Sequence, residues 1–268
     1  MANYRPEMTD AGIHSLHETT VLDEHGEVRE ISLTGERPLT IYLDKREIVT
    51  LMTLGSYPEL LTLGYLRNQN LVDHIEDVVS IQVDWDVESV AVTTRRAKEN
   101  LDQLLSKKIV TSGCGQGTMF AHVMDSLSEL SLQCPPFSAA SIYHVLDSLT
   151  EYNQMYKKAG AVHGCALCSM EQIDFFVEDV GRHNAVDAIS GWMWMNGVTG
   201  DNKVFYTTGR LTSEMVIKVA QMRVPLLLSR SGVTEMGLRL ARQVGIGMVA
   251  RAKGRHFLVY SGQQEFTA

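Results

Sequence analysis

The segment TSGCGQG places Cys114 among glycines at positions 113, 115 and 117. A loop with so little side-chain bulk can flex, and it leaves a thiol open to a large reactant. Thiolate chemistry needs that access, whereas a buried structural cysteine does not. The segment therefore predicts a reactive cysteine, although a tight turn with an incidental cysteine would have the same composition. His122, eight residues further on, could supply a base.

A second segment that could carry chemistry is VHGCALCS, which contains His163, Cys165 and Cys168. The Cys-x-x-Cys spacing suits zinc, a reducible disulfide or persulfide handling. Zinc usually takes four ligands, or three and a water, and the sequence has no second Cys-x-x-Cys. If the segment opens a helix, the helix dipole would make the thiols more reactive, whereas burial would make them inert. Both interpretations stay open, and we expect no permanent metal.

Three strand-to-helix junctions have similar content: EDVGRHNAVD follows IDFFV, GRLTSE follows VFYTT, and RSGVTE follows PLLLS. Each places an arginine (Arg182, Arg210 or Arg230) between an apolar strand and the next predicted helix. In an open parallel sheet such junctions line one edge, where helix N-termini and arginine side chains bind phosphate. The sequence therefore predicts a phosphate-bearing ligand here. The alternative is that each arginine pairs with a neighbouring carboxylate, the candidates being Glu178, Asp179, Glu214 and Glu235.

His183 and Asp187 are four residues apart in GRHNAVD and could share one face of a helix near that edge. The histidine could act there as an acid, a base or a ligand donor. A structural hydrogen-bonded pair is the alternative. We interpret both residues as lining the site.

The elements that must position these residues change character along the chain. Residues 1–20 show no period and are predicted to form a loose arm. Residues 21–106 contain short strands and one helix that begins near Ser56 and Pro58, so they predict a β-rich subdomain. In residues 107–268 one long helix is predicted from Ser138 to Lys158, and strands then alternate with helices. This alternation predicts an α/β domain with a largely parallel sheet covered on both sides.

The composition limits the possible functions. The chain has 268 residues and a formal net charge of −8, which argues against non-specific nucleic-acid binding. No apolar run is long enough to span a membrane, and the N-terminus lacks the layout of a secretion signal, so we expect a cytoplasmic protein. With four cysteines in that compartment, reactive thiols or a metal site are more plausible than a disulfide framework.

Taken in order, these segments resemble the FdhD/NarQ family, the accessory sulfurtransferases of formate dehydrogenase. The matching segments cover nearly the whole chain. They are ERPLTIYLDK, LMTLGSYPELLTLGYL, SGCG, VHGCAL, VEDVGRHNAVDAISG, YTTGRLTSEMVIKVAQMRVPLLLSRSGVT and FLVYSG.

The resemblance implies that Cys114 receives sulfur from a cysteine desulfurase as a persulfide and passes it to molybdenum bis(guanine dinucleotide) cofactor for formate dehydrogenase. It implies a three-layer α/β/α sandwich similar to cytidine deaminases, joined to a smaller β-rich N-terminal part. The segment similar to the family's cofactor-binding segment comprises Phe257, Leu258, Val259, Tyr260, Ser261 and Gly262. The arginine-lined edge, with Arg182, His183, Arg210 and Arg230, fits a ligand with phosphates and guanine. A homodimer is a further expectation, since homodimers are the commonest oligomers.

One departure from the family pattern bears on the mechanism. The family loop often carries two cysteines three residues apart, but here Gly117 follows Cys114 at that distance. Sulfur must then pass directly to the acceptor or through another thiol. We hypothesise that Cys165 or Cys168 substitutes for the missing cysteine.

Two other functions compete with sulfur transfer. A non-catalytic chaperone for the guanine-dinucleotide cofactor would bind the nucleotide without depending on Cys114. A zinc hydrolase is suggested by the deaminase-like fold and by His163 with the two following cysteines. Zinc deaminases need a glutamate two residues after the histidine, and Cys165 stands there instead.

Overall fold

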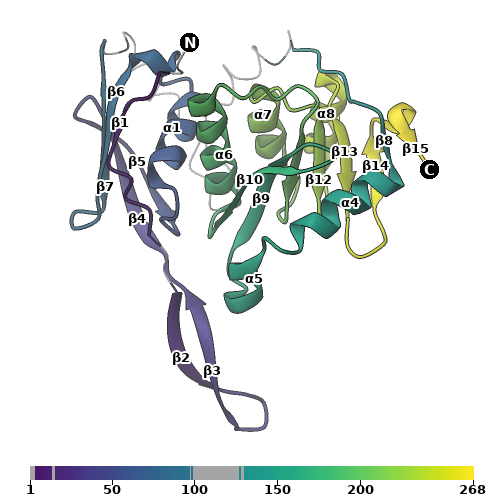
Figure 1. The fold of residues 1–268 in the computed structure, drawn as a ribbon, viewed down its shortest axis with the longest axis horizontal. Helices are drawn as coiled ribbons and strands as arrows, with labels where there is room; N and C mark the ends of the chain where they lie inside the picture. Colours follow the sequence, from purple (N-terminus) through teal and green to yellow (C-terminus); the bar gives the residue numbers. More distant parts are fainter. Residues whose placement is uncertain (1–3, 14–15, 97, 99–126, 128–129) are drawn as a thin grey trace.

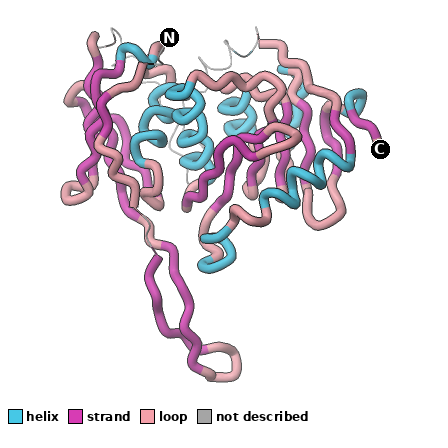
Figure 2. The backbone as a smooth tube through the Cα atoms, viewed as in Figure 1, coloured by secondary structure: helices cyan, strands magenta, loops and turns pink. Residues whose placement is uncertain are grey.

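The computed structural model describes residues 4–13, 16–96, 98, 127 and 130–268, which form two main sheets with helices between and around them (Figures 1 and 2). One sheet has five strands in the order β1-β6-β7-β4-β5, and the other has six in the order β10-β9-β11-β12-β13-β14. Cys114, His122 and the predicted boundary after residue 106 lie outside the described residues. Among the described residues, no helix combines the length and apolar character needed to cross a membrane.

The five-stranded sheet belongs to the N-terminal part. Its strands are β1 (Glu7–Met8), β4 (Arg37–Leu43), β5 (Arg46–Thr53), β6 (Val78–Asp84) and β7 (Ser89–Thr94). Alternate residues of β4, namely Leu39, Ile41 and Leu43, are buried, as expected for a strand with one face toward the core. Helix α1 (Pro58–Asn68) begins at Pro58, as the sequence predicts, and a short 3₁₀ helix (Ile75–Asp77) precedes β6.

The prediction of a loose arm over residues 1–20 is wrong for the residues that the structure describes. Strand β1 pairs in parallel with β6, and the Tyr4 hydroxyl donates to the Val78 carbonyl at 2.7 Å. The indole Nε1 of Trp85 donates to the Ala11 carbonyl, also at 2.7 Å. An edge strand such as β6 has unpaired backbone groups that a short segment can satisfy without any apolar period of its own.

The six-stranded sheet is mixed. Its strands are β9 (His163–Cys168), β10 (Ile173–Asp179), β11 (Val204–Thr207), β12 (Leu226–Ser229), β13 (Gly247–Ala250) and β14 (Leu258–Ser261). Strands β11, β12 and β13 pair in parallel, but β9 is antiparallel to both neighbours and β14 is antiparallel to β13. The prediction of a largely parallel sheet is therefore wrong, because strands buried on both faces have the same apolar pattern in either direction.

Helices cover both faces of this sheet. One face packs against α6 (Arg182–Asn196), α7 (Ser213–Gln221) and α8 (Glu235–Val244), and the other against α4 (Ala139–Leu149). This gives the three-layer α/β/α arrangement. The likeness to cytidine deaminases stays a prediction. The two-stranded pair β8 (Phe137–Ser138) and β15 (Phe266–Thr267), joined to β14 by a 3₁₀ turn (Gln263–Glu265), completes this part.

The long helix predicted from Ser138 to Lys158 is two helices, α4 and α5 (Gln154–Ala159). Ser138 caps the first in a capping box with Ser141. Between the two helices, the Asn153 side chain donates to the Leu149 carbonyl at 2.7 Å, which satisfies a terminal carbonyl of α4 and interrupts the helix. Gly160 ends α5 with φ 73°, as the sequence predicts.

The two halves are joined where α1 crosses α6. A Cβ atom on Gly64 would lie 1.7 Å from the Asp187 carbonyl oxygen, and one on Gly191 would lie 2.0 Å from that of Leu60. The two helix backbones therefore touch at a point where no other residue fits. Figure 1 shows α1 and α6 side by side between the sheets.

Candidate functional site

The three predicted strand-to-helix junctions lie at one edge of the six-stranded sheet. Strands β10, β11 and β12 run in the same direction and end at Asp179, Thr207 and Ser229. Arg182, Arg210 and Arg230 follow these ends, and α6, α7 and α8 begin there. We call this border, together with the loop that follows β13, the arginine edge.

An open cleft of about 540 Å³ lies at the arginine edge. His163 enters it from the start of β9, which is opposite Asp179 in the sheet register. The lining holds cationic and hydroxyl groups but no carboxylate, which favours an anionic ligand. The lining residues are Tyr156, Gly160, Ala161, Val162, His163, Val180, Thr208, Arg230, Ser231 and Lys253.

His163 is held as a neutral imidazole in this setting. Burial lowers its pKa, and the nearby positive charges of Arg182 and Arg210 lower it further. Its Nδ1 lies 3.3 Å from the Thr208 hydroxyl. The arginine edge therefore contains two guanidinium groups and a neutral histidine within electrostatic reach of one another. Arg230 lines the cleft itself, whereas Arg182 and Arg210 are not among the lining residues; the charge of Arg230 also partly offsets the burial that raises the pKa of Tyr206.

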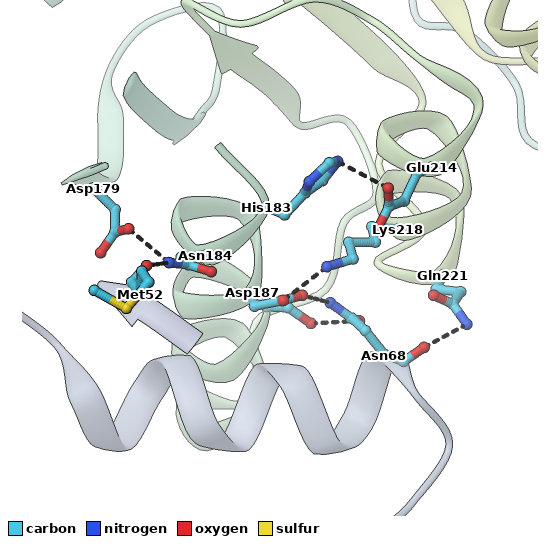
Figure 3. Close-up of polar contacts among 10 residues, drawn as sticks. Met52, Asn68, Asp179, His183, Asn184, Asp187, Glu214, Lys218 and Gln221 are labelled. Carbon is cyan, nitrogen blue, oxygen red and sulfur yellow. Dashed lines mark hydrogen bonds and ion pairs between the residues drawn. The ribbon is translucent and has the colours of Figure 1, made fainter. Parts of the chain in front are cut away.

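Beneath the arginine edge, α6 and α7 are connected by two layers of charged groups (Figure 3). In the first helical turns, His183 Nε2 lies 3.3 Å from Glu214 Oε2 without hydrogen-bond geometry. One turn deeper, Lys218 Nζ donates to Asp187 Oδ2 at 2.7 Å. The other oxygen of Asp187 accepts from the Asn68 amide of α1, also at 2.7 Å. The side chains of the two ionic contacts are mostly or wholly buried.

Burial and neighbouring charges explain how these groups titrate. Burial lowers the pKa of His183 to about 2, with further lowering by Lys218, Arg182 and His163. Burial raises the pKa of Glu214 and of Asp187, and Lys218 counteracts the rise in both. His183 is therefore neutral, while Asp187 and Lys218 form a buried ion pair that depends on both partners. The predicted proximity of His183 and Asp187 on one helix is correct, but each has a separate partner on α7.

Asp179 fixes the arginine edge to the N-terminal sheet. Its Oδ2 accepts from the Thr53 hydroxyl at 2.6 Å and from the Leu54 amide at 3.0 Å. Its Oδ1 accepts from the Gly181 amide and the Asn184 side chain at 2.9 and 2.8 Å. The sequence suggests Asp179 only as a possible ion-pair partner of an arginine. Its role is to position the β10–α6 junction.

The sequence reasoning missed several residues, among them Thr208, Lys253, Lys218 and Asn68. Lys218 had a usable signal, since it is a cation four residues after Glu214 in a helix that is otherwise apolar between its terminal residues Ser213 and Gln221. Thr208 and Lys253 had none, because they lie in loops without a pattern.

The predicted cofactor segment, Phe257–Gly262, is only partly at the arginine edge. Strand β14 is antiparallel to β13, so Leu258 lies beside Ala250 at that edge, whereas Ser261 pairs with Met248 toward the opposite edge. Ser261 and Gly262 line a second cleft, of about 760 Å³, with Cys134 and Arg242. The structure therefore does not bring the whole segment together with the three arginines.

Cys165 and Cys168 lie in strand β9, not at the start of a helix. Three residues apart on a strand, they point to opposite faces: Cys165 packs toward α6 and Cys168 toward α4. Both have 0% exposure, and burial raises the pKa of both thiols, that of Cys165 to about 12. The Cys165 thiol donates to the Thr207 hydroxyl at 3.2 Å.

This placement contradicts the hypothesis that either cysteine substitutes for a loop thiol, because neither is accessible or readily ionised. It also contradicts a zinc pair, since their sulfurs cannot converge on one ion. Within the described ranges, no group of three or more histidine, cysteine or carboxylate side chains is arranged to hold a metal.

Comparison with known proteins assigns the family. The family model described as "FdhD/NarQ family" matches residues 34–267. The chain is 28% identical to the sulfur carrier protein FdhD of Listeria monocytogenes over 91% of this chain and 95% of that one. It is 27% identical to that of Bacillus subtilis, over 89% and 92%. A putative formate dehydrogenase accessory protein from Desulfotalea psychrophila has the same fold, with a TM-score of 0.72 and 25% identity, over 94% of this chain and 99% of that one. The chain therefore belongs to the FdhD/NarQ family.

Proposed function

We propose that this protein carries sulfur from a cysteine desulfurase to molybdenum bis(guanine dinucleotide), which is its bound substrate, during maturation of a formate dehydrogenase in the cytoplasm. The observation that carries the proposal is the arginine edge, a cationic cleft at the site where open α/β sheets bind phosphates. The family and the names of the relatives support a role as a sulfur carrier.

In the first step, the Cys114 thiolate attacks the outer sulfur of the desulfurase persulfide. A new S–S bond forms on Cys114, the donor's S–S bond breaks, and the donor cysteine leaves as a thiolate. Because Cys165 and Cys168 are buried, we propose direct transfer from Cys114 to the substrate, without a relay through either thiol.

At the arginine edge, this chain's own residues bind and orient the substrate. Arg182 and Arg210 offer charge to the phosphates, and the N-termini of α6 and α7 add backbone N–H groups. Neutral His163 can donate or accept a hydrogen bond there without adding charge. Glu214 lies beside His183 and within electrostatic reach of Arg182, and Lys218 pairs with Asp187, so both side chains support the edge from beneath.

Intact-mass analysis after incubation with a cysteine desulfurase and cysteine tests the sulfur-carrying step. The wild type should gain about one sulfur mass, and Cys114→Ala should gain none. Cys134→Ala is the matched control and should still gain sulfur. If the Cys114→Ala variant gained sulfur as well as the wild type, another thiol would be the carrier.

Calorimetric titration with GDP tests the binding step separately. Arg210→Ala should weaken binding about tenfold or more, because it removes a phosphate ligand. Arg239→Ala, at an exposed position of α8, is the matched control and should bind as the wild type does. Equal affinities for the two variants would remove the arginine edge from the binding site.

A non-catalytic chaperone for the same cofactor is the second candidate. It is favoured by Gly117 in place of a second loop cysteine and by the burial of Cys165 and Cys168, which leaves no relay thiol in β9. Tight GDP binding without any gain of sulfur mass would support it over sulfur transfer.

A further inference from the structure

A third cleft, of about 380 Å³, lies between the C-terminal ends of α1 and α7, and we call it the α1–α7 cleft. Helix α7 begins at the arginine edge and extends about 13 Å to Gln221, so this cleft lies at the opposite border of the six-stranded sheet. The ribbon of β2 (Leu16–Leu22) and β3 (Val28–Thr34) projects from the side of the arginine edge (Figure 1). It therefore leaves the α1–α7 cleft uncovered.

Two arginines of the α1–α7 cleft have no carboxylate partner among the residues that the structure describes. Arg67 donates to the Ser190 carbonyl at 3.2 Å and lies 5.6 Å from the centre of the Trp194 ring. Burial lowers the pKa of Arg67, so its charged form would be stabilised by an anion. Arg223 is exposed at the end of α7. An anion that enters the cleft would meet two uncompensated positive charges.

The carboxylate in the lining does not cancel these charges. Asp73 pairs with Lys98 at 2.7 Å, and Lys98 also donates to the Asn70 carbonyl at 2.6 Å. The pair of Asp73 and Lys98 is neutral as a unit. The cleft therefore keeps the net positive charge of its two arginines, although the whole chain has a net charge of −8.

The cleft also has a hydrogen-bond acceptor that is not used within the described part of the chain. Gln221 Nε2 donates to the Asn68 carbonyl at 3.4 Å, whereas Gln221 Oε1 is buried and accepts no hydrogen bond (Figure 3). A buried acceptor without a donor costs free energy, which a bound N–H group would recover. A ligand with a carboxylate and a neighbouring backbone N–H would satisfy both the arginines and Gln221. An acidic segment of a protein has both groups.

The position of the cleft in the chain connects it with Cys114. The described residues nearest to Cys114 in the sequence are Lys98 and Leu127. Lys98 is bonded to two residues of the lining, Asn70 and Asp73, and Leu127 lines the cleft itself. A protein bound at the α1–α7 cleft would therefore lie beside both points where the segment with Cys114 joins the described chain.

We propose that the α1–α7 cleft docks an acidic surface segment of the cysteine desulfurase. This inference rests on the proposed sulfur-carrying function and locates the donor. A carboxylate of the segment lies between Arg67 and Arg223, and a backbone N–H donates to Gln221 Oε1. Since most of the chain is acidic, this local pair of cations orients the incoming partner. Donor and substrate bind at opposite borders of the sheet, so neither blocks the other.

Biolayer interferometry with immobilised desulfurase measures docking without any sulfur transfer. Arg223→Gly removes a guanidinium and relieves a left-handed backbone (φ 59°), so this variant should fold and should bind about tenfold or more weakly. Arg67→Met keeps the packing on Trp194 and should show a similar loss. Arg255→Met is the matched control, because Arg255 also lies over an aromatic ring, that of Tyr143, and should bind as the wild type does. A wild type that does not bind, or equal affinities for the cleft variants and the control, would overturn the proposal.

Sulfur loading from two donors separates failed docking from failure of the proposed function. Intact mass should show that Arg223→Gly loads about tenfold or more slowly than the wild type from the desulfurase, at concentrations below the wild-type Kd. From glutathione persulfide the two should load equally, because a small donor needs no docking. Equal slowing with both donors would overturn the proposal. A wild type that binds the desulfurase but loads from neither donor would leave docking supported and contradict sulfur carrying.

Calorimetric titration with GDP tests the alternative anionic occupant of the cleft. Arg67→Met should bind GDP as the wild type does, because the nucleotide belongs to the arginine edge. A loss of affinity of about tenfold in this variant would make the α1–α7 cleft a nucleotide site and would overturn its assignment to the desulfurase.

Discussion

The two faces of the six-stranded sheet are both buried, but different chemistry fills them. Under α4 the packing is apolar and aromatic, with Phe137, Ile142, Leu149 and Tyr206 among the residues. On the other face, α6 and α7 carry His183, Asp187, Glu214 and Lys218 into the interior. Buried charge is costly unless each group keeps its partner. The difference shows that the first face is scaffold, whereas the second shapes the arginine edge directly above it.

The largest effect is expected from breaking the deeper ion pair. Lys218→Met leaves the Asp187 carboxylate buried without a cation, which should lower the free energy of unfolding by about 3–5 kcal/mol. Urea denaturation monitored by circular dichroism measures it. Adding Asp187→Leu should recover much of the loss, since no charge then stays unpaired.

The control for that variant is Lys203→Met, which removes the partly exposed pair with Asp174. Its loss should be at most about 1 kcal/mol. If the two lysine variants lost the same free energy of unfolding, burial of charge would not distinguish the two faces.

A smaller effect is expected from pH. His183 titrates near 6.5 when unfolded but near 2 when folded, so below pH 6.5 protons bind the unfolded chain preferentially. Between pH 7 and pH 5 this group should reduce stability by about 1–2 kcal/mol. Glu214, whose pKa is raised, works in the opposite direction. His183→Gln should flatten the fall in the urea midpoint between these pH values, whereas His25→Gln, at an exposed position, should leave it unchanged.

On the apolar face a minor change in packing should have a smaller effect still. Ile142→Val removes one buried methylene beneath the sheet and should lower the free energy of unfolding by about 1 kcal/mol. This loss should be the same at pH 7 and pH 5, because no titrating group is involved. A loss that changed with pH would mean that the two faces are coupled.

The smallest effect concerns the reactivity of the cysteine thiols, and no change in stability is involved. Cys165 and Cys168 point to different faces but are equally closed, so neither should react with iodoacetamide in the native protein. Cys134 is half-buried and should react slowly, since its pKa is raised to about 11 by burial and Glu265. Peptide mass spectrometry before and after unfolding in urea compares them. If one β9 cysteine were labelled in the native protein and the other were not, the face of the sheet that carries the labelled cysteine would be accessible to the reagent.

The arginine edge could be predicted from the sequence because each apolar run is followed at once by an arginine and a helix start. The direction of β9 could not be predicted, since the strand is apolar after His163 and has no period. The Cys-x-x-Cys spacing is compatible with reactive thiols and with inert, buried ones; the structure decides for the second, because both cysteines are small apolar residues of an interior strand. The break between α4 and α5 depends on one side-chain hydrogen bond of Asn153, which helix periodicity does not reveal.

The sequence predicts the charged layers under the edge only in part. The spacing of His183 and Asp187 places them on one helix, but their partners on α7 depend on how two helices pack in space. Asn68 was out of reach, because it approaches Asp187 from a helix 119 positions earlier in the chain.

The contact between Gly64 and Gly191 has a consequence for how the chain could be divided. Because two backbones touch there, the N-terminal sheet is not a module that could be removed, exchanged or expressed alone with its surface intact. Cutting the chain between the halves would expose α1 along the whole stripe that faces α6. The two fragments should therefore each be poorly soluble and should recover the native fold only when refolded together.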